Sequence, residues 1–317
     1  MNKLPYLDFA KGVCMILIIF GHIFPYESHP AVVYAYSFHV PAFFIISGIL
    51  LEHTKEYERP ILTLAKNNIL RLIVPYISFE TVYNVIYCIY NGFGNFGWLT
   101  WQTFTLYGTG LATWFLPVLF AAKVYLLLVK KIVKNQIIVG VACIVPFCFA
   151  MFIGLNDSNV HWLFFIVLRS CNAIGLLWVG TLLHRYLDSI TKSSSTLMLC
   201  IVVSLGAGLS NGRISTCWMD YRNPILYILA AISGTIMLIC IGSRLKSYGP
   251  ISFFSKNSVI VLGIHEQIQL LLIRYLRETT VDEHWFAFMI LIILLQYPIA
   301  YFINRFAPFM VGKWYSS

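Results

Sequence analysis

The feature that most constrains this chain is a series of long apolar stretches, each about as long as the 20 residues that a helix needs to cross a membrane. The stretches show no period of two, which would indicate β-strands. Because lipid offers the backbone no hydrogen bonds, such stretches adopt helices. Ten can be read along the sequence, at residues 10–25, 37–52, 70–90, 112–129, 136–154, 161–183, 195–210, 223–242, 257–273 and 285–304.

The composition of the chain excludes a soluble globular domain. Only 11% of its residues are charged and 59% are hydrophobic, whereas a soluble domain carries about 25% charged residues. We therefore expect an all-α integral membrane protein, a bundle of about ten transmembrane helices in which residues 1–317 form a single domain. The first stretch follows lysines, as a signal peptide would, but no small-x-small cleavage site comes after it. We expect it to be retained as a span.

Lysines and arginines gather in alternate connections between the stretches. With a cytoplasmic N-terminus, sixteen of the 22 basic residues lie inside and four outside, and Lys123 and Arg169 lie within spans. This bias predicts that both termini are cytoplasmic. The net charge of +9 therefore reflects membrane orientation, and no basic, aromatic-interleaved surface indicates nucleic acid. The eight cysteines form no CxxC pair, so neither a disulfide framework nor a metal site is expected.

Two connections on the expected external side differ in character. The segment 91–111 is uncharged and rich in glycine and aromatic residues, which is typical of a segment lying at the membrane interface. The segment 211–223 carries Arg213, Asp220 and Arg222. We expect it to be a solvated loop, with contact to an acceptor molecule as the alternative.

Ionisable side chains at hydrocarbon depth are the most informative residues, since each is costly unless it is paired or lines a cavity. Lys11 and His22 stand eleven positions apart on the first span, so they share one face and are separated by a rise of about 16 Å. A cation at the entrance and an imidazole deeper inside fit a passage for an anionic donor. Alternatively, Lys11 reaches lipid phosphates and His22 bonds to a neighbouring helix. His39, at the outer end of the second span, lies at the level of His22.

The remaining buried charges are expected to form ion pairs. Glu80 and Lys123 can pair across the third and fourth spans, and Arg169 matches Glu266. With Asp8, which precedes the first span, these residues make an expected buried charge network. Such pairs are often architectural rather than functional.

Short motifs are spread over nearly the whole chain: Asp8-Phe9-Ala10-Lys11-Gly12, His22, Phe38-His39-x-Pro41-x-Phe43-Phe44-x-x-Ser47-Gly48, Arg71-Leu72-x-x-Pro75-Tyr76, Trp114-Phe115-Leu116 and an aliphatic run ending in His265. Together they resemble the acyltransferase 3 family, and those in the first two spans are the most specific. This family consists of membrane-bound O-acyltransferases that modify bacterial surface carbohydrates. The chain has a lysine at position 11 where many members have arginine, which keeps the charge but loses the bidentate geometry.

The resemblance implies acyl-CoA, most often acetyl-CoA, as a cytoplasmic donor substrate, with no permanently bound cofactor. It also implies a hydroxyl of an extracytoplasmic or lipid-linked glycan as acceptor, and a bacterial inner membrane as location. Lys11, Arg71 and the basic 55–71 connection are suited to bind the phosphates of CoA. Four further candidates for substrate binding are Ser47, Tyr76, Trp114 and His265.

The chemical roles centre on the two histidines. We expect His22 to act as general base on the sugar hydroxyl, and His39 to orient it or to stabilise the oxyanion; a covalent acyl-histidine is the alternative. A second function, a multi-pass transporter or flippase of a polysaccharide precursor, also fits ten helices with charges near the midplane, although no inverted repeat is found. A structural partner in polysaccharide assembly is a third. The acceptor sugar, the acyl group and the oligomeric state stay open.

Overall fold

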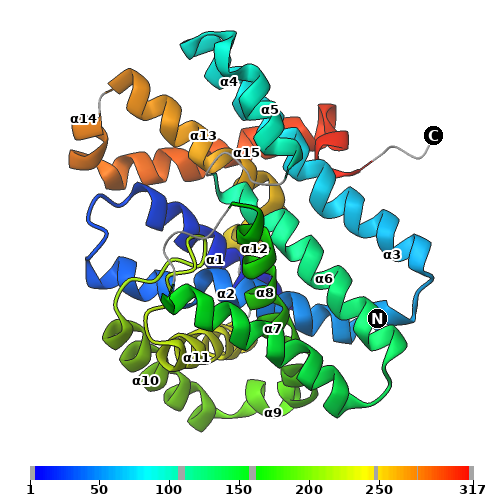
Figure 1. Cartoon of the computed structure of the whole chain (residues 1–317). Helices are drawn as coiled ribbons and strands as arrows, with labels where there is room; N and C mark the ends of the chain where they lie inside the picture. Colours follow the sequence, from blue (N-terminus) through cyan, green and yellow to red (C-terminus); the bar gives the residue numbers. More distant parts are fainter. Residues whose placement is uncertain (1–3, 106–110, 157–161, 246–248, 277, 314–317) are drawn as a thin grey trace.

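The chain folds into a bundle of helices in the computed structural model (Figure 1). Within the part of the chain that the structure describes, the one strand-like pairing is an isolated bridge between Ser215 and Asp220. The all-α fold expected from the apolar stretches is therefore confirmed. The described residues are 4–105, 111–156, 162–245, 249–276 and 278–313.

Ten helical segments among these residues are long and apolar enough to cross a membrane, which confirms the multi-pass membrane protein. They are α1 (Pro5–Ile23), α2 (Pro30–His53), α3 with α4 (Ile61–Asn91), η4 with α6 (Ala112–Ile132), α7 (Gln136–Asn156), α8 (Trp162–Leu183), α10 (Ser194–Asn211), α11 (Pro224–Arg244), α13 (Ser258–Leu276) and α15 (Trp285–Phe306). The shorter helices are α5 (Phe96–Phe104), α9 (Leu187–Lys192), α12 (Gly249–Lys256), α14 (Glu278–Glu283) and the 3-10 turn η6 (Pro308–Val311).

The third span is longer than expected, because the helix α3 (Ile61–Asn68) precedes α4 (Val74–Asn91). A π-helical turn, Ile69–Ile73, joins the two. Pro75 lacks the N–H that would bond to the carbonyl of Arg71. The N–H of Val74 bonds to the carbonyl of Ile69, five positions back, where an α-helix would use the carbonyl four positions back. Arg71 therefore lies in an irregular turn, a feature that often accompanies functional sites.

The helix α2 lies at the centre of the bundle, between α8 and α11. Its residues are apolar on all sides and mostly buried, as expected for an enclosed helix. A Cβ atom added at Gly48 would lie 1.9 Å from the carbonyl oxygen of Leu177, and one added at Gly180 would lie 2.0 Å from that of Ile45. Glycine thus lets the backbones of α2 and α8 touch, which is a common way for membrane helices to associate.

The helix α1, which carries the predicted site residues Asp8, Lys11 and His22, packs against α2, α11 and α12. A Cβ atom added at Gly12 would lie 2.2 Å from the carbonyl oxygen of Ile251 in α12. This close approach fixes the rotation of α1 about its axis. The directions in which Lys11 and His22 project follow from that rotation.

The segment 91–111, expected at the membrane interface, forms the short helix α5 packed against α4. Trp98 and Trp101 of this helix are stacked, with ring centroids 4.8 Å apart, and both are exposed. Residues 106–110 of the segment lie outside the described residues. The interfacial position of α5 stays a prediction from its aromatic residues.

We expect Gly180→Ala to destabilise the protein by about 1–3 kcal/mol, because the added methyl group would force α2 and α8 apart. Gly206→Ala is the matched control, since Gly206 lies in α10 with open space where a Cβ would be. Alanine favours a helix more than glycine does, so the control should be neutral or slightly stabilising. Thermal unfolding of both variants in detergent measures the difference. Equal midpoints would contradict the direct packing of α2 on α8.

Candidate active site

A cavity of about 800 Å³ runs through the bundle beside α1. We call one end the cationic end, lined by Lys11, Arg71, Lys256 and Lys313, and the other end the loop end, lined by Glu27, Arg213 and Asp282. Residues of α1, α2 and α13 line the middle, among them His22, His39, Ser47 and Glu266.

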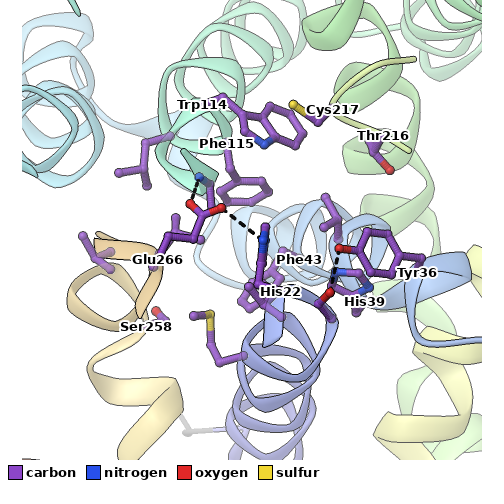
Figure 2. Close-up of a pocket in the computed structure, with 18 of the residues that line it drawn as sticks. His22, Tyr36, His39, Phe43, Trp114, Phe115, Thr216, Cys217, Ser258 and Glu266 are labelled. Atoms are coloured by element: carbon purple, nitrogen blue, oxygen red, sulfur yellow. Dashed lines mark hydrogen bonds and ion pairs between the residues drawn. The ribbon is translucent and has the colours of Figure 1, made fainter. Parts of the chain in front are cut away.

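The imidazole of His22 faces this cavity from the last turn of α1 (Figure 2). Its Nδ1 lies 3.1 Å from Oε1 of Glu266 in α13. The side chain of Gln269, one turn further along α13, donates a hydrogen bond of 2.6 Å to the backbone carbonyl of His22. Two contacts thus tie the end of α1 to α13 at the level of the imidazole.

The carboxylate of Glu266 is held by a second contact. Its Oε2 accepts a hydrogen bond from the backbone N–H of Ala112 at the start of the fourth span (Figure 2). Since a carboxylate can only accept, the proton of a neutral His22 lies on Nδ1, and Nε2 keeps a free lone pair. The same arrangement of carboxylate and imidazole prepares histidine as a general base in other enzymes.

His39 lies in the cavity wall on α2 with 3% of its surface exposed. Its Nδ1 lies 2.6 Å from the carbonyl oxygen of Ala35, so Nδ1 of the neutral ring carries the proton and Nε2 is the acceptor. The ring of Tyr36 packs edge-on against it at 5.0 Å, and the Tyr36 hydroxyl donates to the carbonyl of Gly21. Tyr36 therefore joins α2, which carries His39, to the end of α1, which carries His22.

His265 lies beside His22, with the two ring centroids 5.2 Å apart, and is 1% exposed. Its Nδ1 contacts the carbonyl oxygen of Val261 at 2.8 Å, and its Nε2 has no hydrogen-bond partner among the described residues. One ligand atom from each of His22, His265 and Glu266 lies within 4.8 Å of the others. Two imidazoles and a carboxylate are a donor set that suits a divalent metal. The absence of a metal, expected from the cysteine pattern, stays a prediction.

The structure brings most of the predicted binding residues to the cavity. Lys11, Ser47, Arg71 and Trp114 line it. Tyr76 and His265 are not among its lining residues. Tyr76 is fully buried, and its hydroxyl donates a hydrogen bond of 3.1 Å to the carbonyl of Thr103 in α5. This tyrosine therefore joins α5 to α4, and its assignment to substrate binding stays a prediction that this contact does not support.

The predicted pair of Glu80 and Lys123 is wrong. Lys123 lies 2.8 Å from Glu56, which begins the 3-10 turn η1 (Glu56–Glu58) that follows α2. Glu80 is buried and accepts a hydrogen bond from the hydroxyl of Thr113. The pairing differs because Glu56, placed in a connection by the sequence, folds back into the bundle and is 6% exposed.

The predicted pair of Arg169 and Glu266 is also wrong, since Glu266 contacts His22 instead. The Nε of Arg169 donates a hydrogen bond of 2.6 Å to the carbonyl of Cys217. Its guanidinium lies 5.2 Å from the ring centre of Trp114, a cation–π distance. Arg169 therefore fixes a cavity-lining indole and a loop rather than a carboxylate.

Asp8 forms an ion pair with Lys11 at 3.3 Å and accepts a hydrogen bond of 2.9 Å from the hydroxyl of Ser255. It thus belongs to the cationic end of the cavity. The five residues expected to form one buried charge network therefore make separate contacts in different parts of the bundle.

The loop 212–223, expected to be solvated, covers the loop end of the cavity. Arg213 forms an ion pair of 2.6 Å with Glu27 and lies 4.6 Å from the ring centre of Tyr36. Burial raises the pKa of the Cys217 thiol in this loop above its ordinary value. Because the thiolate is the nucleophilic form, Cys217 is a wall residue rather than a prepared nucleophile.

The sequence reasoning missed several cavity residues. Lys256 and Lys313 at the cationic end were read only as orientation signals, and Glu27 and Gln269 were not considered. Their roles depend on which helices are neighbours, which the order along the chain does not give. One signal was present: Glu266 is a carboxylate at the depth of an imidazole, and such groups are expected to pair.

Comparison with known proteins decides the family. Residues 4–305 match the acyltransferase 3 family model, which is described as an acyltransferase domain. The chain belongs to the acyltransferase 3 family. No curated protein and no solved structure matches it. Membership confirms the resemblance seen in the first two spans, and it makes the chain a membrane acyltransferase with an acyl donor and an acceptor.

We expect the ion pairs of this acyltransferase to be separable by double-mutant cycles on stability. Lys123→Met and Glu56→Gln should each destabilise the protein by about 3–5 kcal/mol, because each leaves a buried partner charge unpaired. Combined, they should show a coupling energy of about 0.5–3 kcal/mol, whereas Lys123→Met with Glu80→Gln should be additive to within about 0.5 kcal/mol. Thermal unfolding in detergent provides the values. Coupling to Glu80 and not to Glu56 would restore the pair predicted from the sequence.

Proposed function

We propose that this membrane acyltransferase is an O-acetyltransferase that moves an acetyl group from cytoplasmic acetyl-CoA to a hydroxyl of an extracytoplasmic or lipid-linked glycan. The observation that carries the proposal is the contact between His22 and Glu266 in the wall of a cavity with cations at one end. The cations suit the phosphates of CoA, and the imidazole suits removal of a proton from a hydroxyl. Family membership favours this enzyme over a transporter or flippase.

The orientation that we propose places the cationic end and both termini in the cytoplasm of a bacterial cell. The excess of lysine and arginine in the connections on that side supports it. The loop end, with the loop 212–223, then faces the acceptor. In this arrangement the donor enters from inside, and the glycan never crosses the membrane.

The reaction that we propose begins with the acceptor hydroxyl next to Nε2 of His22. As the hydroxyl oxygen attacks the thioester carbonyl, Nε2 takes its proton and a tetrahedral intermediate forms. When the carbon–sulfur bond breaks, the imidazolium returns the proton to the departing thiolate, leaving free CoA and the acetyl ester. The carboxylate of Glu266 orients the ring through Nδ1 and stabilises the imidazolium.

His39 has a different role in this proposal. Because its Nδ1 proton is engaged by Ala35, the neutral ring offers only an acceptor atom to the cavity. It is therefore unsuited to stabilise an oxyanion, which requires a donor. Because the single proton of the reacting hydroxyl goes to His22, His39 supports orientation of the glycan by accepting a hydrogen bond from another of its hydroxyls. A covalent route through acetyl-His22 differs from direct transfer in one measurable respect, since it forms modified protein when acetyl-CoA is present without an acceptor.

We expect His22→Ala to lower the rate of acetyl transfer by about 10²–10⁴-fold, because the general base is lost. Glu266→Gln should lower it by about 10²-fold or more, since an amide cannot fix the tautomer and stabilise the imidazolium. His284→Ala, at a histidine outside the cavity wall, is the matched control. Detergent-purified protein with labelled acetyl-CoA and surface glycan extracted from cells lacking the gene provides the measurement.

A near wild-type rate for correctly folded His22→Ala would contradict the proposed role of this histidine. Mass spectrometry of the wild-type protein after mixing with acetyl-CoA alone separates the two routes. An acetyl group on His22 supports the covalent route, and unmodified protein supports direct transfer.

A further inference from the structure

The cationic end of the cavity is built by side chains from four separate elements. Lys11 comes from α1, Arg71 from the π-helical turn, Lys256 from the last residue of α12, and Lys313 from the segment after η6. The last two lie in the C-terminal part of the chain and were not predicted as binding residues. Their convergence on one opening is therefore a property of the fold rather than of a motif.

These four cations differ in whether a carboxylate balances them. Lys11 is half-buried and paired with Asp8. Arg71, Lys256 and Lys313 are exposed, and none forms an ion pair with a carboxylate of the described chain. Three unbalanced positive charges around one opening repel each other unless an anion joins them. The site therefore favours a ligand with several negative charges.

The position of Lys313 is fixed by close packing. Gly312 has a φ of 67°, and a Cβ atom added there would lie 1.7 Å from the carbonyl oxygen of Leu70. The segment after α15 thus lies directly on the turn that carries Arg71. The Nζ of Lys313 donates a hydrogen bond of 2.8 Å to the side chain of Asn304. The packing of Gly312 on Leu70 therefore holds Lys313 and Arg71 at the same opening.

Lys256 is held in a similar way. The helix α12 packs on α1 through the contact of Gly12 with Ile251. Ser255, the residue before Lys256, donates its hydroxyl hydrogen bond to Asp8, the partner of Lys11. The end of α12 is therefore anchored next to the first turns of α1, with its lysine in the cavity wall.

We propose that Lys256 and Lys313, together with Arg71, form a phosphate-binding site that recognises the phosphomonoester of the donor nucleotide, and that this site distinguishes CoA from donors lacking that group. The inference rests on the proposed function, since it concerns the same donor. A phosphomonoester carries a charge of about −1.5 to −2 near pH 7 and three acceptor oxygens. Several amino and guanidinium donors can bind it at once, which a single lysine cannot achieve.

Binding of CoA and of 3′-dephospho-CoA to the purified full-length protein in detergent, followed by calorimetry, tests this site without any acceptor. We expect the wild-type protein to bind CoA at least about tenfold more tightly than the dephospho form, as expected for loss of charged hydrogen bonds. Lys256→Gln and Lys313→Gln should each weaken CoA binding about tenfold, with little effect on the dephospho form. Lys256→Arg and Lys313→Arg should keep the preference, because the charge is kept.

Lys192→Gln is the matched control, since Lys192 is exposed and does not line the cavity. In assays of transfer, the glutamine variants should raise KM for acetyl-CoA and leave kcat largely unchanged, whereas His22→Ala lowers kcat. This difference separates the phosphate site from the catalytic residues. Size-exclusion profiles and unfolding midpoints equal to those of wild type establish that the variants are folded.

Phosphates of lipid headgroups are a second source of the same chemistry, so the calorimetry is repeated in nanodiscs with and without phosphatidylglycerol. If Lys256→Gln and Lys313→Gln bind CoA like wild type in detergent, or keep the full preference over dephospho-CoA, the inference is overturned. An effect that appears only with the anionic lipid also overturns it. In those cases acetyl transfer from acetyl-CoA still stands. If the wild-type protein binds no CoA and transfers no acetyl group, the proposed function itself is wrong.

Discussion

Placing an imidazole and a carboxylate inside a bundle that faces lipid is the constraint on which this structure depends. Ionisable groups at that depth are costly unless they pair or face a cavity. His22 and Glu266 satisfy each other at 3.1 Å, and Ala112 satisfies the second carboxylate oxygen. The contact therefore explains why α1, α13 and the start of the fourth span meet at one level. The contact between His22 and Glu266 thus lowers the cost of burying these two groups, and the proposed reaction uses the same contact.

The packing around this contact explains why the cavity has a defined shape. Glycine brings α2 against α8 and α1 against α12 at backbone distance. With α1 and α2 fixed by these neighbours, their histidines reach the cavity wall from two directions. Membrane helices lack a hydrophobic driving force between them, so close contacts between small residues supply much of the attraction that holds the helices together.

The sequence predicted the spans well, because the length and polarity of a transmembrane helix are local properties. It also predicted that Lys11, His22 and His39 would face a common passage, since helical periodicity relates positions on the same or adjacent spans. Partners across the bundle were not predictable in this way. Lys123 was matched with Glu80 because both lie in spans, whereas its partner comes from a connection that folds inward. Lys313 could be read only as an orientation signal, because its place at the cavity depends on the packing of the C-terminal segment.

The ion pair of Arg213 with Glu27 bears on a requirement that any enzyme acting across a membrane must meet, which is electrical insulation. A water-filled route open at both faces would carry protons and ions down their gradients. This pair bridges the turn after α1 and the loop 212–223, and both of its residues line the loop end of the cavity. In the reaction that we propose, a contact at this position would limit both the leak of ions and the access of bulk water to the thioester.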